Sequence, residues 1–68
     1  MKISARNVLK GKIIDVTKGA TTAHVKIDVG GIIVTSSITN AAVGELKLAA
    51  GKDAYAVIKA SDVMIGID

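Results

Sequence analysis

The chain has 68 residues, half of them apolar, with a single aromatic residue, Tyr55, and a formal net charge of +3. A chain this short makes a single domain, residues 1–68, with a small core built mainly from Ala, Val and Ile. There is no cysteine and only one histidine, which excludes disulfides and a structural zinc site as additional stabilisation. Association with further copies of the chain is the remaining way to stabilise so small a core. The composition therefore predicts a homo-oligomer.

The N-terminal residues show none of the features of a secretory signal peptide, and no apolar run is long enough to span a bilayer. Together with the absence of cysteine, this pattern predicts a cytoplasmic protein that does not interact with membranes. The nine Lys and Arg residues are spread along the chain without a dense run. Such a distribution fits a protein that tolerates anions nearby, but it does not specify which anions.

The first half of the chain has the period of β-strands. Residues 7–16 alternate imperfectly between apolar and polar, which predicts a half-buried strand, and a turn follows at residues 17–19. Residues 22–29 alternate cleanly, with Ala23, Val25, Ile27 and Val29 on one face. This run predicts an antiparallel strand with one face in water.

The next elements are predicted from their turn and cap residues. Gly30-Gly31 separates the clean strand from residues 32–38, and a two-glycine connection favours a tight hairpin because its turn requires positive φ angles. Thr39-Asn40 predicts the N-terminal cap of a helix of at most two turns, since Gly44 inside it costs about 1 kcal/mol relative to Ala.

Two more strands are predicted near the C-terminus. Residues 54–59 alternate, and after an interruption Val63, Ile65 and Ile67 form one face of a last strand. The sequence therefore predicts an all-β fold with one short helix, arranged as a five-stranded OB-type barrel.

Two polar stretches at opposite ends of this pattern are rich in hydrogen-bond donors. Ser4-Ala5-Arg6-Asn7 and Lys59-Ala60-Ser61 supply a guanidinium, an ammonium, two hydroxyls and backbone N–H groups on small residues. Donors without acceptors suit a tetrahedral oxyanion, so we expect the Asp62 carboxylate to point away. A lone Arg or Lys at a strand end is usually a solvated charge, and the meeting of the two stretches depends on the first and fourth strands being neighbours.

The chain also resembles the molbindins, the small molybdate-binding Mop proteins. The resemblance rests on Met1-Lys2-Ile3-Ser4-Ala5-Arg6-Asn7, on Ser37-Ile38-Thr39 and on the stretch from Tyr55 through Lys59-Ala60-Ser61 to Met64. It implies binding of molybdate, with tungstate as an analogue, for intracellular molybdenum storage. The implied oxyanion site lies at a subunit interface of a homohexamer, a trimer of dimers, and consists of Ser4, Ala5, Arg6, Lys59, Ala60 and Ser61, with Thr39 contributed by a neighbouring subunit.

Two other functions fit the sequence less well. OB barrels also bind single-stranded nucleic acid, but those sites stack bases on aromatic side chains, and this chain has only Tyr55. An enzyme is the weakest alternative, because the sequence has no cysteine, no second histidine and no carboxylate pair. We expect no side chain to ligate a metal directly, and we expect His24 to be a surface residue, Asn7 to anchor the first strand and Gly11 to mark a bulge or close packing.

Overall fold

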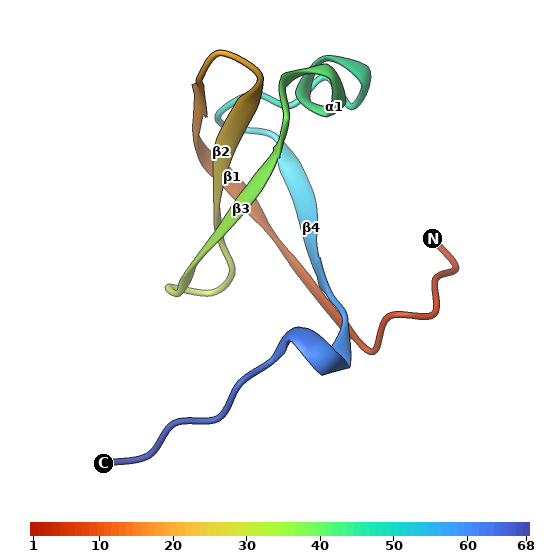
Figure 1. The fold of residues 1–68 in the computed structure, drawn as a ribbon, viewed down its shortest axis with the longest axis vertical. Coiled ribbons are helices and arrows are strands. Elements are labelled where there is room, and N and C mark those ends of the chain that lie inside the picture. The colour runs from red at the N-terminus through yellow and green to blue at the C-terminus, as the bar shows by residue number, and fades with distance from the viewer.

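The computed structural model describes all 68 residues as one curled antiparallel sheet with a short helix at one end (Figure 1). The strands are β1 (Asn7–Lys18), β2 (Thr22–Asp28), β3 (Ile33–Thr39) and β4 (Asp53–Ile58). The helix α1 (Asn40–Glu45) precedes β4, and a single 3₁₀ turn, η1 (Ala60–Asp62), follows it. The strand order is β3-β2-β1-β4, so β3 and β4 form the two edges of the sheet.

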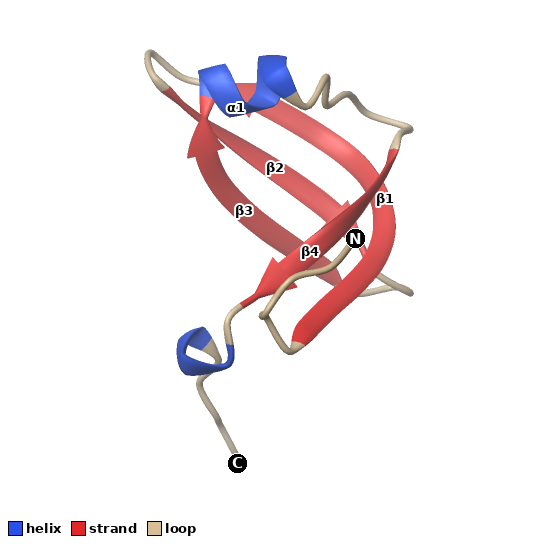
Figure 2. Cartoon of the chain, turned by 90° about the vertical axis from the view of Figure 1, so that its right-hand side faces the viewer, coloured by secondary structure: helices blue, strands red, loops and turns tan.

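A β-bulge explains why the alternation in β1 is imperfect. Ile13 pairs with Ile27 of β2, but the next aligned pair is Asp15 with Lys26, so Ile14 is an extra residue in the ladder. The bulge therefore lets Ile13 and Val16, three residues apart, face the same core. It also bends β1 strongly, as Figure 2 shows, and this bend allows one long strand to pair with β2 at one end and β4 at the other.

The predicted hairpin between β2 and β3 is confirmed. Gly30 and Gly31 have φ angles of 74° and 94°, and the Val29 N–H donates to the Ile32 carbonyl at 2.8 Å. The Asp28 carboxylate accepts a further hydrogen bond from the Gly31 N–H at 2.7 Å. Two consecutive positive φ angles are favourable for glycine, and they match the twist of the two strands that they connect.

The helix begins where its cap residues predict. The Thr39 hydroxyl accepts a hydrogen bond from the Ala42 N–H at 3.1 Å, and the helix has six residues. The Asn40 side chain donates to the Gly19 carbonyl at 3.0 Å, which ties α1 to the turn between β1 and β2. Neither α1 nor η1 is long and apolar enough to cross a membrane.

The core is small. Six residues are buried, namely Ile13, Ala23, Val25, Ile27, Val43 and Ala56. They come from β1, β2, α1 and β4, so the helix covers one end of the curled sheet and contributes Val43 to the core.

The mostly-β fold with one short helix is confirmed, but the predicted fifth strand is absent from this chain. Four strands form, and residues 63–68 extend away from the sheet without regular structure (Figures 1 and 2). Apolar side chains on this tail are exposed, with 88% of Ile65 and 94% of Ile67 accessible to solvent. Alternation alone does not form a strand, because a strand also needs a neighbour that accepts and donates its backbone hydrogen bonds.

Candidate functional site

Segments from opposite ends of the chain meet beside the β1–β4 pair. The ladder between these strands begins with Asn7 opposite Ile58, and the Asn7 side-chain amide donates to the Ile58 carbonyl at 3.2 Å. Residues 3–6 directly precede β1 and residues 59–62 directly follow β4. The antiparallel register therefore places the two segments side by side, and the predicted anchoring role of Asn7 is confirmed.

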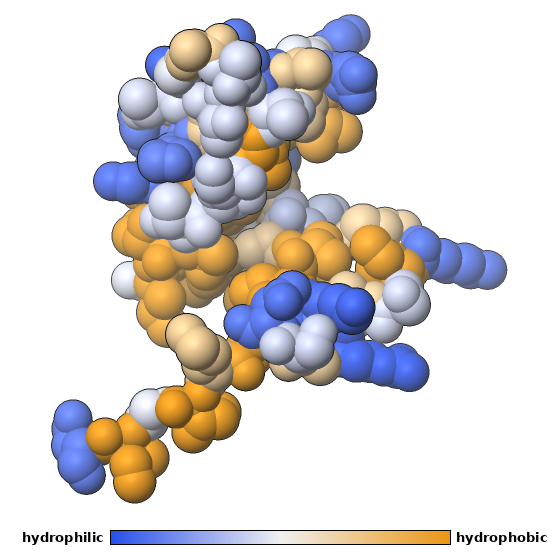
Figure 3. All heavy atoms as spheres, in the orientation of Figure 1, coloured by the Kyte–Doolittle hydropathy of each residue, from blue (hydrophilic) through white to orange (hydrophobic).

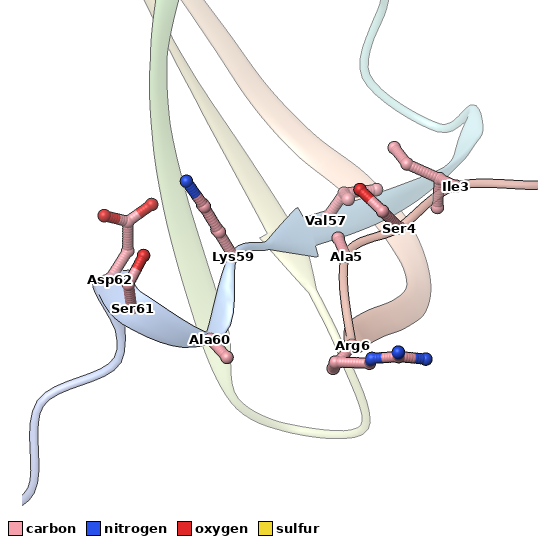
Figure 4. Close-up of a pocket in the computed structure, with 9 residues that line it drawn as sticks. All are labelled: Ile3, Ser4, Ala5, Arg6, Val57, Lys59, Ala60, Ser61 and Asp62. Atoms are coloured by element: carbon pink, nitrogen blue, oxygen red, sulfur yellow. The ribbon is translucent and has the colours of Figure 1, made fainter.

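An open pocket of about 600 Å³ lies between these segments (Figure 4). All six residues predicted from the two end stretches line it: Ser4, Ala5, Arg6, Lys59, Ala60 and Ser61. Two apolar residues that the sequence did not single out, Ile3 and Val57, complete part of the wall. Val57 lies on the face of β4 opposite the buried Ala56, and its apolar character suggested only an ordinary strand position.

The polar groups of the pocket are free to bind a ligand. The side chains of Ser4, Arg6, Lys59 and Ser61 make no hydrogen bond or ion pair within the chain. The backbone N–H of Ala60 is likewise unpaired within the chain. Groups that have no internal partner are exposed to water, and they can exchange that water for the oxygen atoms of an anion.

The 3₁₀ turn η1 orients the C-terminal half of the pocket. The Asp62 N–H donates to the Lys59 carbonyl at 2.9 Å, which closes the turn. Figure 4 shows that Lys59, Ser61 and Asp62 point to one side of this turn and that Ala60 points toward Arg6. The Arg6 guanidinium itself extends away from Ala60 in the same view. Its long side chain is exposed, so it is free to change rotamer.

Asp62 and Thr39 differ in their position relative to this pocket. Asp62 lines the pocket, and its exposed carboxylate is free to turn toward or away from a bound anion. Thr39 does not line it, because it sits at the α1 end of β3 and its hydroxyl caps the helix. The resemblance assigned Thr39 to a neighbouring subunit, and that assignment stays a prediction.

The remaining candidates take structural positions. His24 is exposed on the polar face of β2, opposite Ser37 and Thr17. No group of three or more His, Cys, Asp or Glu side chains lies close enough together to hold a metal ion. Gly11 packs closely, as predicted, since a Cβ atom there would lie 2.4 Å from the Asp28 carbonyl oxygen.

Comparison with known proteins gives a family match over nearly the whole chain. Residues 3–65 match the TOBE domain. The chain is 52% identical to a probable molybdenum-pterin-binding protein of Haemophilus influenzae over the full length of both proteins. It is also similar to solved structures. MopII from Clostridium pasteurianum superimposes with a TM-score of 0.91 at 45% identity, covering 97% of this chain and all of MopII.

A third relative shows the same fold as part of a larger chain. The cytoplasmic molybdate-binding protein ModG, solved with molybdate bound, aligns with a TM-score of 0.95 and 43% identity. The alignment covers all of the present chain and 49% of ModG. The family match, the full-length identity and the shared fold agree with the resemblance in the two end motifs, and the chain belongs to the TOBE-domain family as a member of its molbindin (Mop) group.

Proposed function

We propose that the chain binds molybdate, with tungstate as an analogue, in the pocket between residues 3–6 and 59–62. The observation that carries this proposal is the convergence of six donor-bearing or small residues, predicted from opposite ends of the sequence, on one pocket. The relatives add support, because they are described as molybdenum-pterin-binding and molybdate-binding proteins.

The chemistry of the pocket suits a tetrahedral dianion. Molybdate has four oxygen acceptors and no proton to donate at neutral pH, so it needs donors and positive charge. Arg6 and Lys59 carry that charge, Ser4 and Ser61 supply hydroxyl donors, and the short side chain of Ala60 leaves its N–H accessible. The molybdenum would be held through its oxygens, without direct ligation by a side chain and without a nucleotide.

The exposed surface supports assembly into an oligomer. The chain exposes 5262 Å² of surface, whereas a compact monomer of 6.9 kDa exposes about 4,000 Å². The excess of about 1,300 Å² is more than one partner buries in a typical stable interface. The exposed surface includes large apolar side chains such as Met64, Ile65 and Ile67, and Figure 3 shows the tail as largely orange. Such surface is stabilised when a second copy covers it.

The gap between the edge strands is the place where a second copy fits. Two pockets of about 470 and 220 Å³ share Ser36 of β3 and Tyr55 and Val57 of β4 as lining residues. An additional strand in this gap would pair with both sheet edges and close a five-stranded barrel. Residues 63–67 of another copy have the required alternation, with Val63, Ile65 and Ile67 on one face.

The oligomer is a homohexamer, a trimer of dimers, as the family resemblance implies. In this assembly the pocket lies at a subunit interface, and Thr39 of a neighbouring copy contributes its hydroxyl to the oxyanion. The chain acts by binding alone, without catalysis, and serves to store and buffer molybdenum in the cytoplasm. The description of ModG as cytoplasmic supports this location.

Isothermal titration of the purified protein with molybdate tests the function directly. We expect saturable binding of molybdate and tungstate, and much weaker heats with sulfate and phosphate. Native mass spectrometry in a volatile buffer gives the number of subunits and of bound anions in the same preparation. Absence of heat with every oxyanion would overturn the proposal, and titration with single-stranded nucleic acid would then test the remaining OB-type function.

Replacing Arg6 with alanine should weaken molybdate binding by about tenfold to a hundredfold, because a charge-assisted hydrogen bond to the anion is lost. The Arg6 side chain has no partner within the chain, so the fold and the oligomer mass should not change. Titration calorimetry measures the affinity, and His24→Ala is the control because His24 lies outside the pocket. Unchanged affinity in Arg6→Ala would remove this residue from the site.

A further inference from the structure

Asp62 is the only negatively charged side chain of the pocket, whose other charged side chains are Arg6 and Lys59. Its carboxylate points to the same side of η1 as the Lys59 ammonium and the Ser61 hydroxyl (Figure 4). The hydrogen bond from the Asp62 N–H to the Lys59 carbonyl, at 2.9 Å, holds the residue in this turn. This hydrogen bond fixes the backbone of Asp62 beside the pocket, while the exposed carboxylate stays free to rotate toward a bound anion.

No cation within the chain neutralises this carboxylate. The one ion pair of the structure joins Lys12 to Asp53, and Lys59 and Asp62 do not form a second. Arg6, Lys59 and Asp62 therefore give the pocket a formal charge of +1, where Arg6 and Lys59 alone would give +2. The Asp62 carboxylate thus weakens the attraction of the pocket for a fully deprotonated dianion, since like charges repel across an open pocket.

The same carboxylate favours a different kind of oxyanion. Hydrogen phosphate carries its own proton, and a carboxylate can accept a hydrogen bond from it, whereas molybdate and sulfate have no proton to donate at neutral pH. We infer that Asp62 is a specificity-determining residue of the oxyanion pocket, which lowers its affinity for deprotonated dianions and makes it tolerate an oxyanion that carries a proton. This inference rests on the proposed function.

The experiment compares three anions in two variants of the full chain. Asp62→Asn removes the charge with little change of shape, and Asp62→Ala also removes the acceptor. Asp15→Asn is the matched control, because it changes the net charge by the same amount on an exposed residue of β1 outside the pocket. Titration calorimetry with molybdate, sulfate and inorganic phosphate gives the dissociation constants at one ionic strength.

In both Asp62 variants the affinities for molybdate and sulfate should rise together by about threefold to tenfold. The affinity for phosphate should change less than twofold in Asp62→Asn, because the weaker amide acceptor offsets the lost repulsion. It should fall in Asp62→Ala, where no acceptor remains at this position. Asp15→Asn should leave all three affinities within about twofold of the original chain, since solvent and salt screen a distant charge.

The possible failures are distinguishable. If the original chain binds none of the anions, the proposed function itself is wrong. If it binds molybdate and neither Asp62 variant changes the affinity, the site stands and the role of Asp62 is overturned. Equal increases for all three anions would also overturn it, because they would show a general charge effect without discrimination by the proton.

Discussion

Replacing Ile65 with aspartate should convert the proposed oligomer into smaller species, in the limit into monomers. In the proposed assembly this side chain faces the core of a second copy, between the edge strands β3 and β4. The substitution removes about 1.5–3 kcal/mol of apolar burial and adds the cost of burying a carboxylate, which is several kcal/mol. Because each interface contains this contact, the assembly constant should fall by more than about a thousandfold.

Met64→Asp is the control for this prediction. Met64 lies in the same tail and is 92% exposed, but it belongs to the opposite face of the alternation. The Met64→Asp substitution introduces the same charge as Ile65→Asp but outside the barrel. The mass of the oligomer should therefore not change. Sedimentation velocity measures the mass, and circular dichroism checks that the strands remain. An Ile65→Asp protein with the original mass would show that the tail does not pair with a second copy.

Gly11→Ala should destabilise the fold by about 2–4 kcal/mol, because its Cβ has no room and the obstruction includes main chain. The added carbon would lie 2.4 Å from the Asp28 carbonyl oxygen and 2.7 Å from the Val29 Cγ1 atom. Backbone cannot rotate aside as a flexible side chain does, so β1 and β2 must separate locally. For a domain of this size the melting temperature should fall by about 10 °C or more.

Gly44→Ala should change the stability of the fold in the opposite direction to Gly11→Ala. Gly44 lies inside α1, and nothing stands within 4 Å of a Cβ atom placed there. Alanine should therefore stabilise the helix by about 0.5–1 kcal/mol through its higher helix propensity. Thermal unfolding followed by circular dichroism measures both variants. A Gly11→Ala protein as stable as the original would show that the close approach of β1 and β2 is not required.

The locally encoded elements could be predicted from the sequence. The alternation from Ala23 to Ile27 predicted β2 correctly because the period of two is set by backbone geometry alone. Gly30-Gly31 and Thr39 predicted the hairpin and the helix cap because each acts on residues within a few positions. The bulge at Ile14 was not predicted, since it is defined by the register against β2.

The site was predicted in composition but not in detail. Its two halves were visible as donor-rich stretches, and the resemblance to the molbindins connected them. The direction of the Asp62 carboxylate stays a prediction, because the residue is exposed and no contact within the chain fixes its side chain. Ile3 and Val57 were missed because apolar residues at strand positions give no signal of a ligand wall.

The sequence by itself determined the strand periods, the hairpin, the helix cap and the donor chemistry at the two ends, since each of these depends on neighbouring residues. Only the tertiary structure decided that β1 pairs with β4 and so joins Ser4-Ala5-Arg6 to Lys59-Ala60-Ser61 in one pocket. It also decided that residues 63–67 find no partner within their own chain. Both outcomes depend on hydrogen bonds between distant backbone segments, and a linear pattern does not specify which segments will meet.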